Sequence, residues 1–205
     1  MPEKVFLELD EEKKERIKEA AMAEFAEYGY TNSSTNNIVK ECGISKGSLF
    51  KYFENKEDLY FYLIDEVVSE MARDLAPAIA GLSKDLKKRI TEYSVAEISW
   101  YIANPLKGKF MISMAAERDS DIYAKIIKRY GQSSDNAYLQ LMRGASLKGL
   151  HHGEKEVCEV LKWVLTGFNE SFLKDRSGKR LSAGRLKEEY LKQLSVYLDI
   201  LFKGL

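Results

Sequence analysis

The chain has 205 residues, 45% of them hydrophobic, which is enough to bury a sizeable core in one or two domains. Basic and acidic residues are equal in number, 32 each, so any nucleic-acid partner has to be bound by a local basic patch. No apolar run approaches the roughly 20 residues of a membrane span, and no basic stretch followed by an apolar core opens the chain, which predicts a cytoplasmic protein without a membrane partner.

The low proline content favours a helical protein. Only three prolines occur, and long segments pass without a glycine, so helices can run for many turns. We therefore predict an all-α fold of about nine helices. Cys42 and Cys158 lack CxxC or Cys/His spacing, which predicts buried thiols and neither a disulfide nor a metal site.

The first predicted helix begins after Asp10, whose side chain suits an N-cap, and ends at Gly29. Its apolar residues recur at helical spacing: Ile17, Ala21, Phe25 and Tyr28. The hydroxyl side chains at 33–35 predict the start of a second, short helix that ends at Gly43.

A third short helix is predicted at 46–53, with Ser45 as its cap. A long helix then runs from Lys56 to about Ala76, where Pro77 stops it. Five further helices are predicted, at Lys84–Ala103, Leu106–Ala115, Asp121–Lys148, Glu154–Lys174 and Ser182–Phe202. In the helix at Asp121–Lys148 the helical spacing of the apolar residues breaks near Gly131.

The two short helices around Gly43-Ile44 have the spacing of a helix-turn-helix. Glycine permits the left-handed backbone of the turn, and Ile44 fills the angle between the helices. We expect Leu49 and Phe53, four residues apart, to face the core. The other side chains of the second helix are then left for solvent or DNA, and their chemistry suits phosphates and base edges: Lys46, Gly47, Ser48, Lys51 and Tyr52.

The order and spacing of these residues resemble the TetR family. The resemblance covers about residues 11–70 and lies in Gly29-Tyr30, the run TNNIVKECGISKGSLFKYF at 35–53, and Lys56-Glu57-Asp58-Leu59. It implies an N-terminal helix-turn-helix DNA-binding domain, 1–55, and a helical ligand-binding and dimerisation domain, 56–205. It gives DNA-contacting positions to Thr35, Lys46, Gly47, Ser48, Tyr52 and Lys56. Phe50 stands where the family usually has a tyrosine that meets phosphate, so we expect Phe50 only to pack.

The last two predicted helices are apolar on more than one face, and a second copy of the chain would cover the extra face. Family members similarly form a four-helix dimer interface. The residues predicted for it are Leu161, Val164, Phe168, Phe172, Leu194, Tyr197 and Leu201. The alternative is that both faces lie inside a monomer.

Aromatic and flexible apolar side chains are frequent in the middle of the chain, and the family resemblance implies a ligand pocket there. The candidates are Trp100, Tyr101, Phe110, Met114, Tyr123, Tyr130, Tyr138 and Met142. Asn104, Glu117, Arg118 and Asn169 would add polar specificity, or be solvated or capping groups instead. Ordinary core packing is the alternative for the aromatic set.

The predicted function is a transcriptional regulator, a repressor that binds a palindromic double-stranded DNA operator as a homodimer. A largely apolar or aromatic small-molecule effector releases it.

We expect no cofactor, and no metal at His151-His152, because adjacent histidines diverge. The side chains of the basic run from Lys84 to Arg89 are expected to be exposed to solvent on the surface of a helix. An enzyme is the alternative from another class, but the usual phosphate-loop, HExxH and GxSxG motifs are absent. A helical protein-interaction module is a third possibility.

Overall fold

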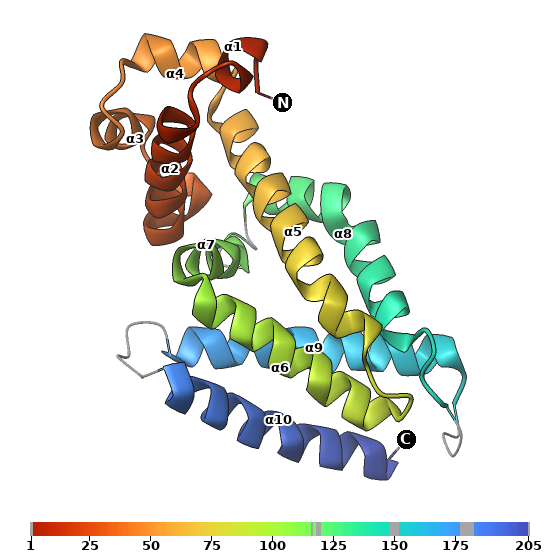
Figure 1. Ribbon diagram of the computed structural model, residues 1–205. Coiled ribbons are helices and arrows are strands. Elements are labelled where there is room, and N and C mark those ends of the chain that lie inside the picture. Colours follow the sequence, from red (N-terminus) through yellow and green to blue (C-terminus); the bar gives the residue numbers. More distant parts are fainter. Residues whose placement is uncertain (1, 116, 118–119, 148–151, 177–182, 205) are drawn as a thin grey trace. The chain divides into compact units, whose positions relative to one another are not determined.

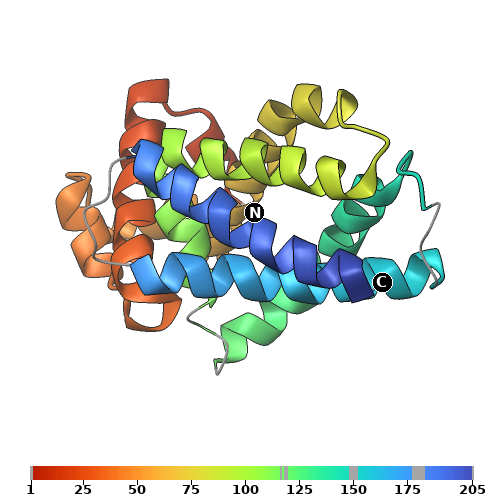
Figure 2. The ribbon, with the colours of Figure 1, turned by 90° about the horizontal axis from the view of Figure 1, so that it is seen from below.

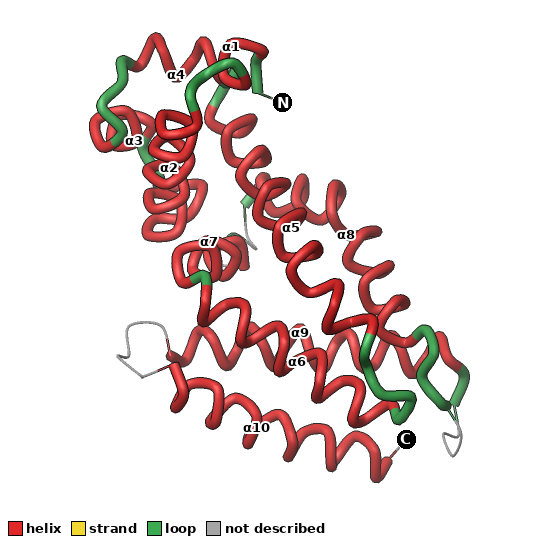
Figure 3. Tube along the Cα trace, in the orientation of Figure 1, coloured by secondary structure: helices red, strands yellow, loops and turns green. Residues whose placement is uncertain are grey.

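The computed structural model describes residues 2–115, 117, 120–147, 152–176 and 183–204. In these residues the chain forms helices and no strand, which confirms the predicted all-α class (Figures 1 and 3). The helices are α1 (Lys4–Leu7), α2 (Glu11–Asn32), α3 (Thr35–Glu41), α4 (Lys46–Tyr52), α5 (Lys56–Ala80), α6 (Leu86–Ala103), α7 (Pro105–Ala115), α8 (Asp121–Met142), α9 (Glu154–Arg176) and α10 (Ala183–Gly204). None of the described helices is long and apolar enough to cross a membrane.

The predicted N-caps of two helices are confirmed. The carboxylate of Asp10 accepts a hydrogen bond from the Lys13 N–H at 2.9 Å, and the Ser45 hydroxyl accepts one from the Ser48 N–H at 3.0 Å. Each cap satisfies a backbone donor that has no partner within the helix. The starts of α2 and α4 are therefore determined by side chains next to them in sequence.

Two predicted helix ends and one predicted break inside a helix differ from the structure. α2 continues past Gly29, where the backbone is kinked, to Asn32. α5 continues past Pro77 to Ala80, and α8 runs through Gly131 without a break to Met142. A proline removes one backbone donor from a helix, and in the last turn this loss affects few hydrogen bonds.

The short helix α1 was not predicted, because four residues are too few to show a helical period. It is held by Phe6, which is fully buried. The Phe6 ring centroid lies 4.8 Å from that of Phe53 and 5.5 Å from that of Tyr62. α1 thus extends the core of the N-terminal helices.

The described helices belong to two compact units. The first unit comprises Met1–Arg73 and Asn104–Lys125, and the second comprises Asp74–Ala103 and Ile126–Leu205. Helix α7 therefore belongs with the N-terminal helices, against which it packs through α2. The predicted functional division after residue 55 is not tested by these units and stays a prediction.

The core of the first unit contains a cluster of aromatic rings. Phe25, Tyr60 and Phe110 are completely buried. The ring centroid of Tyr60 lies 4.9 Å from that of Phe25 and 5.5 Å from that of Phe110, in edge-on arrangements that aromatic pairs prefer. The Tyr60 hydroxyl has no hydrogen-bond partner among the described residues. Burial raises the pKa of this phenol far above its usual value.

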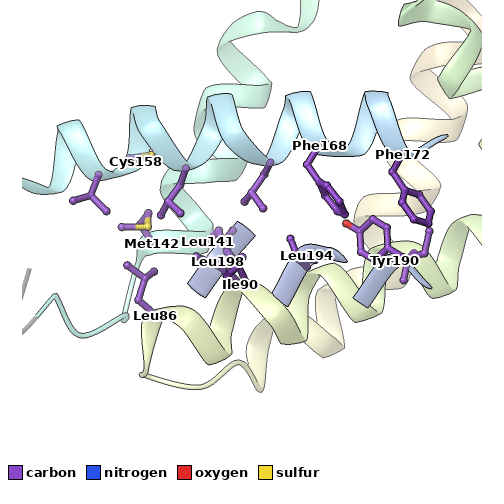
Figure 4. Packing of buried hydrophobic residues seen from close by; sticks show 14 residues of the cluster. Leu86, Ile90, Leu141, Met142, Cys158, Phe168, Phe172, Tyr190, Leu194 and Leu198 are labelled. Carbon is purple, nitrogen blue, oxygen red and sulfur yellow. The ribbon is translucent and has the colours of Figure 1, made fainter. Parts of the chain in front are cut away.

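The core of the second unit lies between α6, α9, α10 and the end of α8 (Figure 4). Phe168, Phe172 and Tyr190 form its aromatic part, with ring centroids 5.0 to 5.8 Å apart. The aliphatic part is supplied by Leu86, Ile90, Ile98, Leu141, Val157, Leu161, Leu165, Leu194 and Leu198. These residues bind the last two helices to α6 within one chain.

Arg89 has an unexpected position in this unit. We expected the basic run at 84–89 to be solvated, but Arg89 is only 7% exposed. Its guanidinium donates hydrogen bonds to the carbonyls of Leu82, Ser83, Leu141 and Arg143. A buried guanidinium is stable only when its donors are paired, so Arg89 joins the start of α6 to the end of α8.

Glu97 on α6 carries a desolvated carboxyl group. The Asn169 Nδ2 atom donates a hydrogen bond to Glu97 Oε2 at 3.4 Å, and the Tyr190 hydroxyl donates one to Asn169 Oδ1 at 2.7 Å. Burial raises the pKa of Glu97 to about 7, because the hydrogen bond from Asn169 lowers it only in part. Between about pH 4.5 and pH 7, Glu97 is therefore protonated in the folded chain. In the unfolded chain, where its pKa has the ordinary value of 4.5, it is ionised over the same range.

This difference predicts a pH-dependent stability. The stabilisation of the folded state that comes from the raised pKa of Glu97 is fully present below about pH 4.5. It is lost as the pH rises through about 7. We expect the free energy of unfolding to fall by about 3 kcal/mol over this interval because of Glu97. Urea unfolding at pH 5 and pH 8 measures the loss. In Glu97→Gln the loss should shrink by that amount, and an identical loss in both proteins would contradict the assignment.

Candidate nucleic-acid interface

The connection between α3 and α4 has the predicted helix-turn-helix form. Gly43 has a φ of +68°, and a Cβ atom placed there would meet nothing within 4 Å, so glycine is favoured by the backbone conformation alone. The Ile44 N–H donates to the Val39 carbonyl at 3.0 Å, which closes the turn.

Cys42, at the end of α3, is buried, as predicted, and Cys158 is buried as well. Burial raises the pKa of the Cys42 thiol, which keeps it protonated and unreactive. Among the described residues no group of His, Cys, Asp or Glu side chains is placed to hold a metal ion. His152 is exposed, and His151 lies outside the described residues.

The inner face of α4 differs from the predicted one at Tyr52. Leu49 and Phe53 are buried as expected, but Tyr52, which we assigned to the DNA side, is only 6% exposed. Its ring centroid lies 5.9 Å from that of Phe6, and its carbonyl accepts a hydrogen bond from the Glu3 N–H at 2.8 Å. Tyr52 follows Leu49 by three residues and so shares its face of the helix. The predicted exposure of Tyr52 is wrong, while its contact with DNA is not tested and stays a prediction.

The outer face of α4 carries exposed Lys46, Gly47 and Lys51. Phe50, which we expected only to pack, is 40% exposed on the same helix. Ser48 is half-buried, and its Oγ atom lies 2.8 Å from Ser45 Oγ. The outer face therefore combines two exposed lysines, a glycine that leaves the helix backbone uncovered, and an exposed aromatic ring.

Lys56 bonds to the chain's own backbone. Its ammonium donates to the Tyr30 carbonyl at 2.6 Å and the Ser33 carbonyl at 3.1 Å, and lies 4.5 Å from the Tyr30 ring centroid. Partial burial lowers the pKa of Lys56, although the nearby Glu117 and Glu24 carboxylates raise it. These bonds fasten the start of α5 to the end of α2. The phosphate contact of Lys56 is not tested and stays a prediction.

Thr35 is half-buried at the first position of α3. The Glu24 carboxylate lies beside this helix start, where its Oε1 atom accepts hydrogen bonds from the Ser34 N–H at 2.8 Å and from Asn37 Nδ2 at 3.1 Å. α3 is thus capped from α2 rather than by its own hydroxyl cluster. The DNA contact of Thr35 stays a prediction.

Glu117, between α7 and α8, caps the last turn of α2. Its Oε1 atom accepts a hydrogen bond from the Thr31 N–H at 3.0 Å, and its Oε2 atom accepts one from the Thr31 hydroxyl at 2.5 Å. Burial alone would raise the pKa of Glu117, but the hydrogen bonds from Thr31, Ser120 and the Tyr30 N–H outweigh it and hold the pKa below its usual value. Of the three roles we considered for Glu117, the structure shows capping.

The Glu117 cap predicts a strong requirement for glycine at position 29. Gly29 has a φ of +70°, and a Cβ atom there would lie 2.4 Å from Glu117 Oε1. We expect Gly29→Ala to lower the free energy of unfolding by about 3 kcal/mol, from backbone strain together with the displaced carboxylate. Urea unfolding measures it.

Gly43→Ala is the matched control, because residue 43 also has a positive φ but open space around a Cβ atom. Gly43→Ala should lower the free energy of unfolding by about 1 kcal/mol, which is the cost of the backbone strain alone. Equal losses in the two variants would show that the Glu117 contact adds nothing to the requirement.

The predicted pocket residues do not gather in one unit. Phe110, Met114 and Tyr123 belong to the first unit, and Trp100, Tyr101, Tyr130 and Met142 to the second. Phe110 and Met142 are core residues, and the Trp100 indole N–H donates to Asp74 Oδ2 at 3.0 Å. The side chains of Tyr138 and Arg118 lie outside the described residues. The ligand pocket stays a prediction.

The predicted dimer residues differ in burial and form three groups. Leu161, Phe168, Phe172 and Leu194 lie in the core of their own chain, and Val164 and Leu201 are half-buried. Tyr197 is 48% exposed. The apolar side chains that α9 and α10 leave open were not in the predicted set, apart from Tyr197; they are Trp163 at 68%, Val196 at 54% and Ile200 at 65% exposure.

Comparisons with known proteins agree with this geometry. Residues 17–63 match the family model of the bacterial regulatory proteins of the tetR family. An HTH-type transcriptional regulator of Staphylococcus aureus is 36% identical over 88 residues, so the chain spans only 44% of that relative, and the match covers 43% of this chain.

Solved structures resemble the whole fold. A TetR family transcriptional regulator from Chloroflexus aurantiacus matches 100% of this chain and 98% of its own, with a TM-score of 0.71 and 22% identity. A TetR-like transcriptional regulator from Rhodococcus sp. RHA1 matches 91% of this chain and 96% of its own, with a TM-score of 0.65 and 17% identity. At these identities the likeness concerns the fold.

Proposed function

This chain carries the DNA-binding domain of the bacterial tetR family at residues 17–63, and on that premise we propose that it is a repressor that binds a palindromic operator as a homodimer. Release from the operator by a small-molecule effector completes the proposal. The observation that carries it is the outer face of α4, where Lys46, Gly47 and Lys51 are exposed on the second helix of a helix-turn-helix.

Each residue of this outer face suits a different part of a DNA duplex. Lys46 and Lys51 neutralise phosphates or donate to guanine edges, and Gly47 allows the helix backbone to approach the groove closely. The Ser48 hydroxyl keeps hydrogen-bonding capacity beyond its contact with Ser45, and Thr35 supplies a further hydroxyl from α3. Tyr52 packs against Phe6, and Lys56 donates to the Tyr30 and Ser33 carbonyls; the DNA contacts assigned to both residues remain part of the proposal.

The dimer surface in this proposal consists of the exposed stripes of α9 and α10, which pack side by side (Figure 2). Trp163, Val196, Tyr197 and Ile200 form these stripes. Large exposed apolar side chains on two neighbouring helices are stabilised when a second copy buries them. A symmetric pair would place its recognition helices about 34–36 Å apart, one turn of DNA.

The effector is proposed from the family resemblance and from the aromatic side chains of the middle helices. It would be largely apolar or aromatic and would prefer a conformation in which the two recognition helices no longer fit successive grooves. Displacement of a labelled duplex from the protein by members of a compound library would identify it.

Selection of genomic fragments by the purified protein tests the proposal. We expect enrichment of an inverted repeat whose half-sites lie about 10 base pairs apart, centre to centre, or a multiple of that distance. Gel-shift titration should show one dimer on each duplex. Enrichment no greater than in a mock selection without protein would overturn the proposal, and enrichment of single half-sites would overturn its dimeric form.

A further inference from the structure

The one open aromatic ring of the helix-turn-helix segment at 35–53 lies on the DNA-facing helix. Phe50 is 40% exposed, whereas Tyr52 and Phe53 on the same helix are buried against Phe6. Transfer of an exposed phenyl ring from water into contact with another apolar group is favourable. The neighbours of Phe50 indicate where that group comes from.

Helical geometry places Phe50 beside Gly47 and Lys46, three and four residues earlier, and side chains on a helix lean toward its N-terminus. Gly47 has no side chain to cover the ring, and a Cβ atom there would find its nearest neighbour, Ser45 Oγ, at 3.8 Å. Lys46 and Lys51 are exposed on either side. When these ammonium groups bind phosphates, Phe50 is carried toward the base edges between them.

We propose that Phe50 reads thymine in the operator by apolar contact between its ring and the thymine 5-methyl group. The inference rests on the proposed function and specifies what the recognition helix selects. A phenyl ring offers no hydrogen bond to a phosphate or to a base edge. The only apolar group on the base edges of the major groove is the thymine methyl, so a preference for thymine over the other bases follows.

The size of the effect follows from the buried methyl group. Removal of one methyl contact should weaken binding about fourfold in each half-site, and about tenfold or more when both half-sites of a palindrome are changed. Deoxyuridine differs from thymidine only by this methyl group, so it removes the contact and keeps the base pair, its hydrogen bonds and the phosphate charge.

The experiment uses the full chain and a duplex obtained by the genomic selection. Each thymidine of a half-site is replaced in turn by deoxyuridine, together with its symmetry mate, and affinity is measured by fluorescence anisotropy. We expect one symmetric pair of positions at which deoxyuridine weakens the wild-type protein about tenfold. Phe50→Ala should bind the thymidine and deoxyuridine duplexes equally, and Phe50→Leu should keep part of the preference.

Lys51→Ala is the control variant, since it should weaken binding to both duplexes and leave their ratio unchanged. Wild-type binding that no deoxyuridine substitution alters would overturn the inference while the proposed function stands, and would place the ring against deoxyribose instead. A ratio that persists in Phe50→Ala would assign the methyl contact to another residue. Failure to select any duplex would overturn the proposed function and this inference with it.

Discussion

Replacement of both Lys46 and Lys51 by alanine is expected to weaken operator binding by about 1,000-fold. The two lysines are exposed on the outer face of α4, so a dimer would lose four charged contacts to DNA. At about 1 kcal/mol for each contact, the loss reaches this size. Fluorescence anisotropy with the selected duplex measures the affinity, and circular dichroism should show unchanged helix content, because neither side chain is buried.

A matched double variant separates this effect from a general loss of positive charge. Lys84→Ala with Lys88→Ala removes the same charge from exposed positions of the second unit. It should bind the duplex within about twofold of the wild type, since Lys84 and Lys88 lie outside the helix-turn-helix segment and exposed charges that do not contact DNA are screened by salt. Equal weakening of binding by the two double variants would contradict the assignment of α4 as the DNA-binding helix.

Replacement of Trp163 and Ile200 by glutamate is expected to convert the protein to a monomer. Both side chains are about two-thirds exposed, so the chain can fold with the substitutions, whereas four carboxylates would meet in the dimer interface. Sedimentation at about 10 μM should show a single chain, and operator affinity should fall about 100-fold or more because the two recognition helices are no longer linked.

Ile127→Glu is the control, because Ile127 is 52% exposed on α8, outside the two proposed stripes. It should sediment as the wild type does. A Trp163→Glu, Ile200→Glu protein that remained a dimer would remove the stripes from the interface. A charge at Phe168 is unsuitable for this purpose, because Phe168 packs in the core of its own chain and its replacement would unfold the second unit.

Features determined by neighbouring residues could be predicted from the sequence. The caps of Asp10 and Ser45, and the turn at Gly43, depend on side chains and backbone within a few residues of each other. The burial of Tyr52 on α4 could also have been predicted from helical periodicity, because Tyr52 lies three residues after Leu49 and therefore shares its inward face. Residue type misled the prediction there, because tyrosine was favoured for DNA contact over phenylalanine.

Contacts between distant residues could not be predicted from one sequence. Glu117 caps Thr31 across 86 residues, and Arg89 reaches the Leu141 carbonyl across 52. The sequence around a charged residue on a polar helix face does not show that a residue distant in the sequence will bind and bury its side chain. The same limit applies to α9 and α10: periodicity identified more than one apolar face, but only tertiary packing decides that Phe168 is covered and Trp163 is open.

The salt dependence of duplex binding tests the central claim, that the outer face of α4 binds DNA through its lysines. Affinity for the selected duplex is measured from 50 to 300 mM KCl. The logarithm of the association constant should fall linearly with the logarithm of the salt concentration, with a slope of about −4 or steeper, since Lys46 and Lys51 of two chains alone would release about four counterions. In the Lys46→Ala, Lys51→Ala protein the slope should become shallower by about 4. A wild-type slope near zero, or the same slope in both proteins, would contradict the claim.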